Sequence, residues 1–296
     1  MELLFGAIAL GLAYAFLGMG IFITMRIFNF PDITADGSLT LGGSLTAALL
    51  TAGVSPWLAV PASMIAGFLA GSATGAIYTK LKVNGLLSGI LVMTALYSVN
   101  LRIMGRSNTP LISVRTLLSP FADIADPTLH LLAPILLFLL LVAVFILFLR
   151  WLFRTDFGLA MRATGDNEVM IAAQGVATDR MKIIGIGCSN ALIALSGSLV
   201  AQYQGFADIG MGIGIIVFGL ASVIIGDTLA GLFGERFRIG IRLICVATGS
   251  ILFRGLVAAT LSIGLNPTDL KIVTAIFVLL TIMLPQARAA IRGRVR

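Results

Sequence analysis

Charge is the scarcest property of this sequence. Only 11% of its 296 residues are charged, 58% are hydrophobic, and the mean hydropathy is +1.06. A typical soluble domain has about 25% charged residues. Apolar runs long enough to cross a hydrocarbon core of about 30 Å recur along the whole chain. The sequence therefore argues against a water-soluble protein and predicts a single membrane domain over residues 1–296.

Cysteine and histidine are nearly absent as well. The two cysteines, Cys188 and Cys245, fall inside apolar runs, where they are typical of small packing residues. This pattern argues against a disulfide framework or a cysteine zinc site. His130 is the only histidine, so a histidine-ligated metal centre or a histidine-dependent triad is not expected. We expect no catalytic residue, no metal and no bound cofactor.

Two further kinds of chemistry are missing. The chain has no G-x-x-x-x-G-K-[ST] loop to cradle phosphates, so we do not expect it to hydrolyse ATP by itself. Its acidic residues fall in predicted loops, and none is expected deep inside a span. Ion-driven transporters usually need such buried ionisable groups, and membrane-embedded enzymes need clustered polar ones, so both classes are disfavoured.

The apolar segments predict an all-α, polytopic integral membrane protein with about eight to ten transmembrane helices. Two of the segments, 38–53 and 210–226, are short and rich in Gly, Ser and Thr. One or both are expected to be interrupted, which is tolerated where protein or water satisfies the backbone. The nine predicted spans are 3–25, 38–53, 56–79, 85–101, 131–153, 183–203, 210–226, 239–262 and 269–284.

Basic residues predict the orientation, because Lys and Arg concentrate in cytoplasmic loops. With a cytoplasmic C-terminus, the inner segments hold fifteen of the 20 basic residues and the outer segments hold Arg102, Arg106, Arg115 and Lys271. Nine spans then place the N-terminus outside, and it lies inside instead if one of the two short segments does not cross. The net charge of +7 is explained by this asymmetry and by attraction to anionic lipid, so no nucleic-acid partner is expected.

One connection between spans carries its own helix signals. It covers about 154–182 and contains FGLAMRATGDNEVMIAAQGVATDRMK at 157–182. Asp166, Asn167 and Glu168 suit the start of a helix, and Gly175 suits its end. We therefore predict a helix of about eight residues outside the membrane.

This segment resembles the cytoplasmic signature of permeases from ABC importers of the branched-chain amino acid, ribose and nucleoside type. Further similarity lies in FNFPDITADGSLTLGGSLTAAL at 28–49 and GIIVFGLASVIIGDTLAG at 214–231. The early segment is most similar to permeases that work with an amino-acid receptor, often for aromatic amino acids, and it differs from the branched-chain and ribose branches. The family pattern G-x-x-x-R-A-x-G-x-N, followed by small apolar residues and a second Gly, is matched by Gly158, Arg162, Ala163, Gly165, Asn167, Ala172, Ala173 and Gly175.

The resemblance implies a non-enzymatic permease subunit in a bacterial inner membrane. Its expected partners are a second permease copy or, alternatively, a close paralogue, together with two ATPase subunits that carry Mg-ATP and a periplasmic or lipoprotein solute-binding protein. ATP-driven closure of the ATPases would push the short cytoplasmic helices and produce alternating access for a small polar solute, with an amino acid as the expected substrate. A sugar or nucleoside is the alternative substrate, and a secondary transporter or channel is the alternative class.

The resemblance also assigns the short helix at Thr164 to Gly175 to ATPase coupling. Its apolar side would seat in a groove on the ATPase, and its acidic residues would meet basic groups at the rim. Arg162 is expected to orient the approach to this helix. The predicted coupling residues are Arg162, Gly165, Asp166, Asn167, Glu168, Val169, Met170, Ala173 and Gly175.

Three further features are interpreted from the residues. Gly67, Gly71 and Gly75 recur every four residues, which favours close helix packing within the chain or, alternatively, at a subunit interface. Asp32 to Ser44 is predicted to be an interrupted helix beside the translocation path, the alternative being a loop and an ordinary span. Arg254 lies inside a span, where an arginine costs at least about 2.5 kcal/mol, so it is expected to contact an anionic ligand group, to pair within the protein, or to extend outward to the membrane surface. The predicted path residues are Asp32, Thr34, Ser38, Thr40, Ser44 and Arg254.

Overall fold

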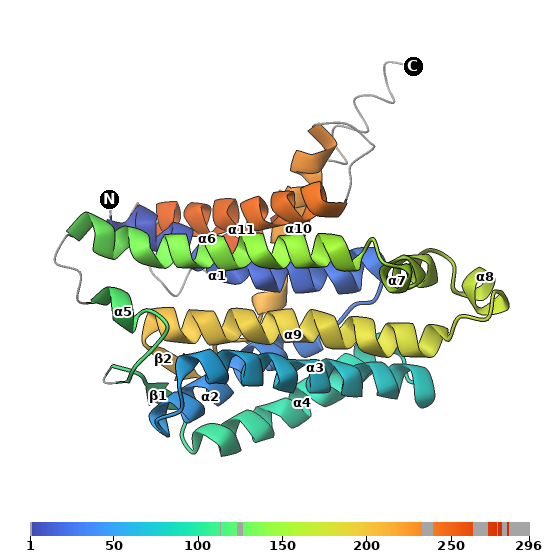
Figure 1. The fold of residues 1–296 in the computed structure, drawn as a ribbon, viewed down its shortest axis with the longest axis horizontal. Helices are drawn as coiled ribbons and strands as arrows, with labels where there is room; N and C mark the ends of the chain where they lie inside the picture. The colour runs from blue at the N-terminus through green and yellow to red at the C-terminus, as the bar shows by residue number, and fades with distance from the viewer. Residues whose placement is uncertain are drawn as a thin grey trace.

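The computed structural model describes residues 2–112, 114–122, 127–232, 239–262, 272–276, 278–279 and 283. Most of this part of the chain is helical, as the composition predicts (Figure 1). Within it, six helices are long and apolar enough to cross a membrane. They are α1 (Glu2–Phe22) with the π-helical turn η1 (Ile23–Ile27), α3 (Pro56–Lys80), α4 (Gly85–Met104), α6 (Pro127–Leu152), α9 (Thr178–Gln204) and α11 (Ile239–Ser262).

Two further helices correspond to predicted spans and are shorter. They are α2 (Thr34–Thr51) and α10 (Ile215–Leu232), each of 18 residues. The remaining elements are shorter still: β1 (Asn108–Pro110), α5 (Ser119–Ala122), α7 (Asp156–Asp166), α8 (Glu168–Ala173) and β2 (Phe206–Asp208). The first eight predicted spans each correspond to one of these helices. The ninth, 269–284, lies largely outside the described residues.

Predicted and observed starts differ by four residues or more at four helices, one of which is α6, which starts four residues before the predicted 131. Helix α2 starts four residues before the predicted 38–53, because the Gly-rich sequence continues a regular helix instead of breaking one. Helix α10 starts at Ile215 because residues 209–214 form a series of turns that ends at Gly214, with φ of +81°. Helix α9 starts at Thr178, five residues before the predicted 183.

Burial separates central from peripheral helices. The most apolar windows of α1 and α9 are 83% and 78% buried, whereas those of α3, α4 and α6 are only 33%, 28% and 22% buried. Helix α6 nevertheless has the highest hydropathy of the six, at 3.2. A strongly apolar helix that is mostly exposed requires lipid rather than water around it. The core of the bundle is thus formed around α1 and α9.

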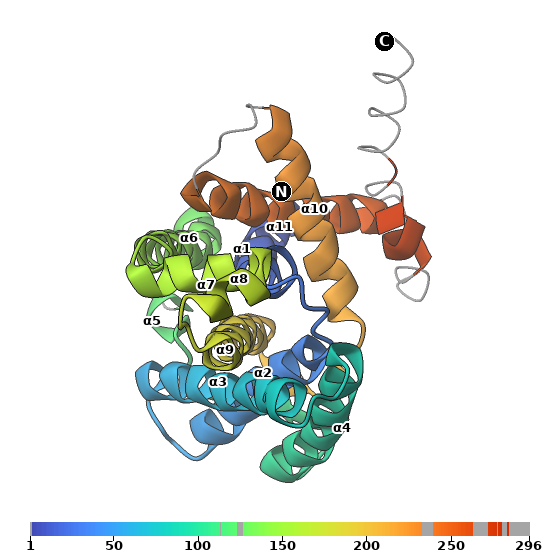
Figure 2. The ribbon, with the colours of Figure 1, turned by 90° about the vertical axis from the view of Figure 1, so that its right-hand side faces the viewer.

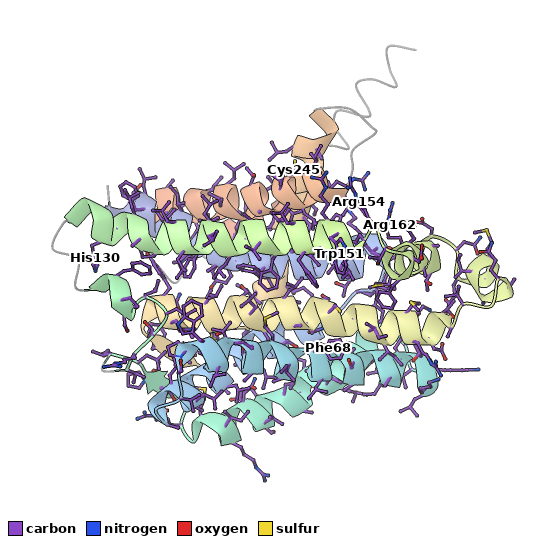
Figure 3. The ribbon with its side chains drawn as sticks, in the orientation of Figure 1. Phe68, His130, Trp151, Arg154, Arg162 and Cys245 are labelled. Atoms are coloured by element: carbon purple, nitrogen blue, oxygen red, sulfur yellow. The ribbon has the colours of Figure 1, made fainter. Side chains whose placement is uncertain are left out.

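The two ends of the bundle differ in structure. At one end, β1 and β2 pair antiparallel, with Thr109 opposite Ala207, near the start of α1 (Figure 1). At the other end, α7 and α8 lie across the bundle, as the end-on view shows (Figure 2). Arg154 and Arg162 lie at this second end and His130 at the first (Figure 3).

Candidate functional site

The break between α1 and α2 positions a buried carboxylate. Helix α1 ends in the π-helical turn η1, and residues 28–33 carry the chain to the start of α2. Asp32 in this break is only 2% exposed. Its Oδ1 accepts a hydrogen bond from the Thr34 backbone N–H at 3.0 Å, and its Oδ2 accepts one from Nδ2 of Asn190 on α9 at 2.6 Å. Through these two hydrogen bonds, the buried carboxylate connects the start of α2 to α9.

Thr34 extends this network to a third helix. Its hydroxyl lies 2.7 Å from the hydroxyl of Thr74 on α3, and both side chains are fully buried. Asn190 is a polar residue inside a predicted span, which is the signal by which sequence reasoning could have found it. Its Oδ1 has no hydrogen-bond partner among the described residues. The break is therefore held by polar side chains from α2, α3 and α9.

The predicted interruption within Asp32 to Ser44 is wrong in position. The irregular backbone lies at 28–33, and Thr34–Thr51 is a continuous helix. The glycines of α2 serve close packing instead: a Cβ on Gly42 would meet the carbonyl oxygen of Ala194, and a Cβ on Gly43 would lie 2.6 Å from Met211 Sδ. Small residues at these positions let the helix backbones touch, which explains a Gly-rich sequence without a helix break.

Asp36 forms a second buried carboxylate contact. It lies in the first turn of α2 and is 8% exposed. Its Oδ2 accepts a hydrogen bond from the Gly214 N–H at 2.8 Å, and its Oδ1 accepts one from the Ile216 N–H at 3.0 Å. It thereby satisfies N–H groups at the start of α10 that have no partner within that helix. The expectation that Asp36 lies in a loop is wrong, because α2 begins at Thr34, and short-range sequence patterns do not reveal that Asp36 caps a helix 178 residues away.

The hydroxyl residues predicted to line a path are mostly engaged within the chain. Ser38 and Ser44 are fully buried, and Thr40 is 4% exposed. The Ser44 hydroxyl donates to Met104 Sδ at 3.1 Å, and the Thr40 hydroxyl donates to the Asp36 carbonyl at 3.1 Å. Asp36 and Thr40 also border a small cavity of about 30 Å³ between α2, α4 and the turns before α10. Ser38 Oγ has no hydrogen-bond partner among the described residues.

The glycines of α3 face α9. A Cβ on Gly67 would lie 2.5 Å from the carbonyl oxygen of Asn190, and one on Gly75 would lie 2.8 Å from the Cα of Ile183. A Cβ on Gly71 would meet the carbonyl oxygen of Ile186. All three glycines therefore allow close packing within the chain, the first of the two interpretations of their spacing.

Arg254 lies near the middle of α11 and is partly buried. Its Cζ is 5.8 Å from the centre of the Tyr14 ring on α1, within the range of a cation–π contact. None of the ion pairs between described residues involves it. The Tyr14 ring therefore lies beside the Arg254 guanidinium, for which the sequence alone indicates no partner.

The connection between α6 and α9 forms two helices joined at one residue. The Asn167 side chain accepts a hydrogen bond from the Met170 N–H at 3.0 Å and caps α8. Gly175 follows with φ of +87°, a conformation that glycine adopts without strain. The predicted start and end of the short helix are confirmed. The predicted single helix from Thr164 is wrong in one respect, because Thr164, Gly165 and Asp166 belong to α7.

Contacts with the bundle fix α7 and α8. Gly165 on α7 packs so closely on η1 that a Cβ would meet the carbonyl oxygen of Ile27. Ile171 of α8 is buried, and Glu168 pairs with Lys182 of α9 at 2.6 Å. Glu168 is therefore engaged within the chain. Val169 and Met170 instead point outward, with exposures of 81% and 51%. Arg162 and Ala173 are exposed as well.

These helices and their lipid-facing surfaces define a multi-pass membrane protein. A family model described as the permease component of a branched-chain amino acid transport system matches residues 3–283. The chain belongs to this family, and it is the permease component of an ABC-type transport system.

Three relatives show the breadth of the similarity. A tyrosine transport system permease protein of Clostridioides difficile is 41% identical over 268 residues, which cover 90% of this chain and 86% of that protein. An uncharacterised protein of Rickettsia prowazekii is 31% identical over 95% of this chain and 97% of its own length. A ribose import permease protein of Haemophilus influenzae is 26% identical over 78% of this chain and 67% of its own length.

Proposed function

We propose that this chain is the membrane subunit of an importer for an aromatic amino acid, with tyrosine as the first candidate. The observation that carries the proposal is the 41% identity, over 90% of the chain, to a tyrosine transport system permease protein. A sugar is the second candidate, favoured by the weaker similarity to a ribose import permease protein.

In this proposal the α7–α8 end faces the cytoplasm of a bacterium. Arg154 and Arg162 lie at that end (Figure 3), and Arg180 lies in the first turn of α9, which follows α8. The positive-inside rule expects such basic residues on the cytoplasmic side. The start of α1 and the β1–β2 ribbon then lie on the outer side, where a solute-binding protein delivers the substrate. The C-terminal segment would be cytoplasmic by the same rule.

The partner ATPases would dock on α8. An isolated helix of six residues is not stable in water, so α8 depends on the contacts around it. Ile171 faces the bundle, whereas Val169 and Met170 expose apolar surface that a groove on a partner protein would cover. Two copies of the permease with two ATPases would couple the hydrolysis of Mg-ATP to alternating access of the membrane path.

A variant pair tests the docking surface. Val169→Asp places a charge on the most exposed apolar residue of α8, and Ile112→Asp does the same at the opposite end, where Ile112 is 89% exposed. Both proteins should reach wild-type abundance in the membrane. Val169→Asp should lose ATPase co-purification and uptake, and Ile112→Asp should retain ATPase co-purification. Normal ATPase binding by Val169→Asp would contradict docking at α8.

Substitutions at Glu168 and Ala173 extend the test. Charge reversal at Glu168 also removes its ion pair with Lys182, so its effect combines docking with a local structural change. A bulky polar residue at the exposed Ala173 avoids this complication. Uptake of labelled tyrosine by cells with the ATPase and the solute-binding protein tests the substrate. Binding of ribose, and not of amino acids, by that solute-binding protein would favour the second candidate.

A further inference from the structure

A cavity of about 420 Å³ lies at the α7–α8 end of the bundle, apart from the polar network at Asp32. Its volume falls within the range of about 300–1,000 Å³ that is typical of small-molecule sites. Four parts of the chain form its walls: the break at 28–31, the facing ends of α3 and α4, the α7–α8 segment, and the start of α9. The cavity thus joins the proposed coupling segment to the membrane helices.

An ion pair between a largely buried lysine and a glutamate that is 45% exposed forms one side of this cavity. Lys182 Nζ lies 2.6 Å from Glu168 Oε2, and the lysine side chain is only 12% exposed. The same ammonium group lies 5.0 Å from the centre of the Tyr78 ring. An ammonium that is largely removed from water interacts more strongly with an anion than a surface lysine does. The pair therefore presents one positive and one negative group to a ligand in the cavity.

Aromatic side chains form the adjoining side, where Tyr78 lies next to Lys182. Phe30 and Tyr78 pack with ring centres 5.0 Å apart, and Phe28, which lies against Gly185, also lines the cavity. Gly85 and Gly185 leave room for these rings, because a Cβ on either would collide with Phe30 or Phe28. A flat apolar group would find a matching surface here.

We propose that this cavity binds a free aromatic α-amino acid on the cytoplasmic side. The ligand carboxylate would pair with Lys182, its ammonium group with Glu168, and its ring with the aromatic side. The choice of ligand rests on the proposed function, since the importer would deliver this class of molecule to the compartment that the cavity faces.

Binding would change the contacts of α8. The zwitterion replaces one internal ion pair with two ion pairs to the ligand, so the two side chains separate without leaving a charge unpaired. Besides the buried side chain of Ile171, the Glu168–Lys182 ion pair holds α8 against α9. Its exchange would loosen the segment on which the ATPase docks. Amino acid that has accumulated in the cytoplasm would therefore bind this site and lower the rate of import.

The first experiment measures equilibrium binding of tritiated tyrosine to the full-length permease in lipid nanodiscs, without ATPase or solute-binding protein. We expect saturable binding with a Kd below about 1 mM. Tyramine lacks the carboxylate and 3-(4-hydroxyphenyl)propionate lacks the ammonium group, so each should bind about tenfold more weakly or worse. These comparisons use the unchanged protein and do not depend on whether a variant folds.

A matched pair of variants locates the site. Lys182→Gln should weaken tyrosine binding about tenfold or more. Lys80→Gln removes a lysine at the same end that pairs with Asp179, has a side chain 63% exposed, and does not line the cavity, so it should bind tyrosine as the wild type does. Equal loss in both variants, or none in Lys182→Gln, would overturn the assignment.

Other outcomes separate this inference from the proposed function. Tyrosine uptake by the complete importer, with no tyrosine binding to the isolated permease, would refute the cavity site and leave the proposed function intact. Equal affinity for tyrosine and tyramine would refute the role of Lys182. Absence of amino-acid uptake, with tyrosine bound in the cavity, would refute the proposed substrate but not the site.

Discussion

Replacing Gly42 with alanine tests whether α2 and α9 touch through their backbones. A Cβ on Gly42 would meet the carbonyl oxygen of Ala194 and lie 2.7 Å from its Cα. The contact is reciprocal, because a Cβ on Gly197 of α9 would meet the carbonyl oxygen of Leu39 on α2. Backbone atoms cannot move aside by changing rotamer, so the two helices themselves would have to separate.

Two effects of opposite sign determine the size of the change. Alanine is favoured over glycine inside a helix by about 1 kcal/mol, which stabilises the variant. Overpacking a close contact costs about 1–3 kcal/mol, and contact with a backbone favours the upper part of that range. We therefore expect a net loss of about 1–2 kcal/mol in the free energy of unfolding. For a chain of this size, that loss lowers the Tm by about 2–8 °C.

The assay is thermal unfolding of the purified permease in nanodiscs, with Gly255→Ala as the matched control. Gly255 also lies inside a helix, but among the described residues no atom beyond its own helix backbone and chain neighbours lies within 4 Å of a Cβ built on it. Alanine there should leave the Tm unchanged or raise it slightly. If Gly42→Ala melts at or above the wild-type temperature while Gly255→Ala behaves as expected, the close backbone contact is refuted.

Three further substitutions test separate contacts by thermal unfolding, with a second measurement for two of them. Asp36→Ala leaves the Gly214 and Ile216 N–H groups without their acceptor and should lower the free energy of unfolding by about 1–3 kcal/mol, with Asp36→Asn intermediate. Equal stability of the wild type and both variants would contradict the cap. Asn167→Ala removes the cap of α8 and should increase protease cleavage near this helix without changing the Tm by more than a few degrees. Arg254→Leu should cost about 0.5–2 kcal/mol through loss of the Tyr14 contact, and wild-type stability together with wild-type uptake would exclude both a packing and a ligand role.

Hydrophobic runs and caps were sufficient to predict most of the fold. Eight predicted spans correspond to helices, because apolar length is a local property of the sequence. The cap at Asn167 and the turn at Gly175 are local as well, so the boundaries of α8 follow from neighbouring residues. Contacts across long sequence separations were not predictable in this way.

The glycines of α2 show why local patterns fail at a distance. A Gly-rich segment fits either an irregular backbone or a close helix crossing, and only the position of α9 distinguishes the two. Asp32 was predicted to lie near the path and Asp36 was not, and the partners of both, Asn190 and Gly214, lie more than 150 residues away. The residues were thus identifiable as polar and unusual, whereas their roles depended on the packed bundle.

The β1–β2 ribbon limits how its end of the bundle can rearrange. Besides the strand pairing, the Leu111 N–H donates to the Gly205 carbonyl at 2.7 Å, and the Ile209 N–H donates to the Ser107 carbonyl at 2.9 Å. These bonds join the end of α4 to the end of α9, about a hundred residues further along the sequence. Any rearrangement that separates α4 from α9 at this end would therefore have to break the ribbon first.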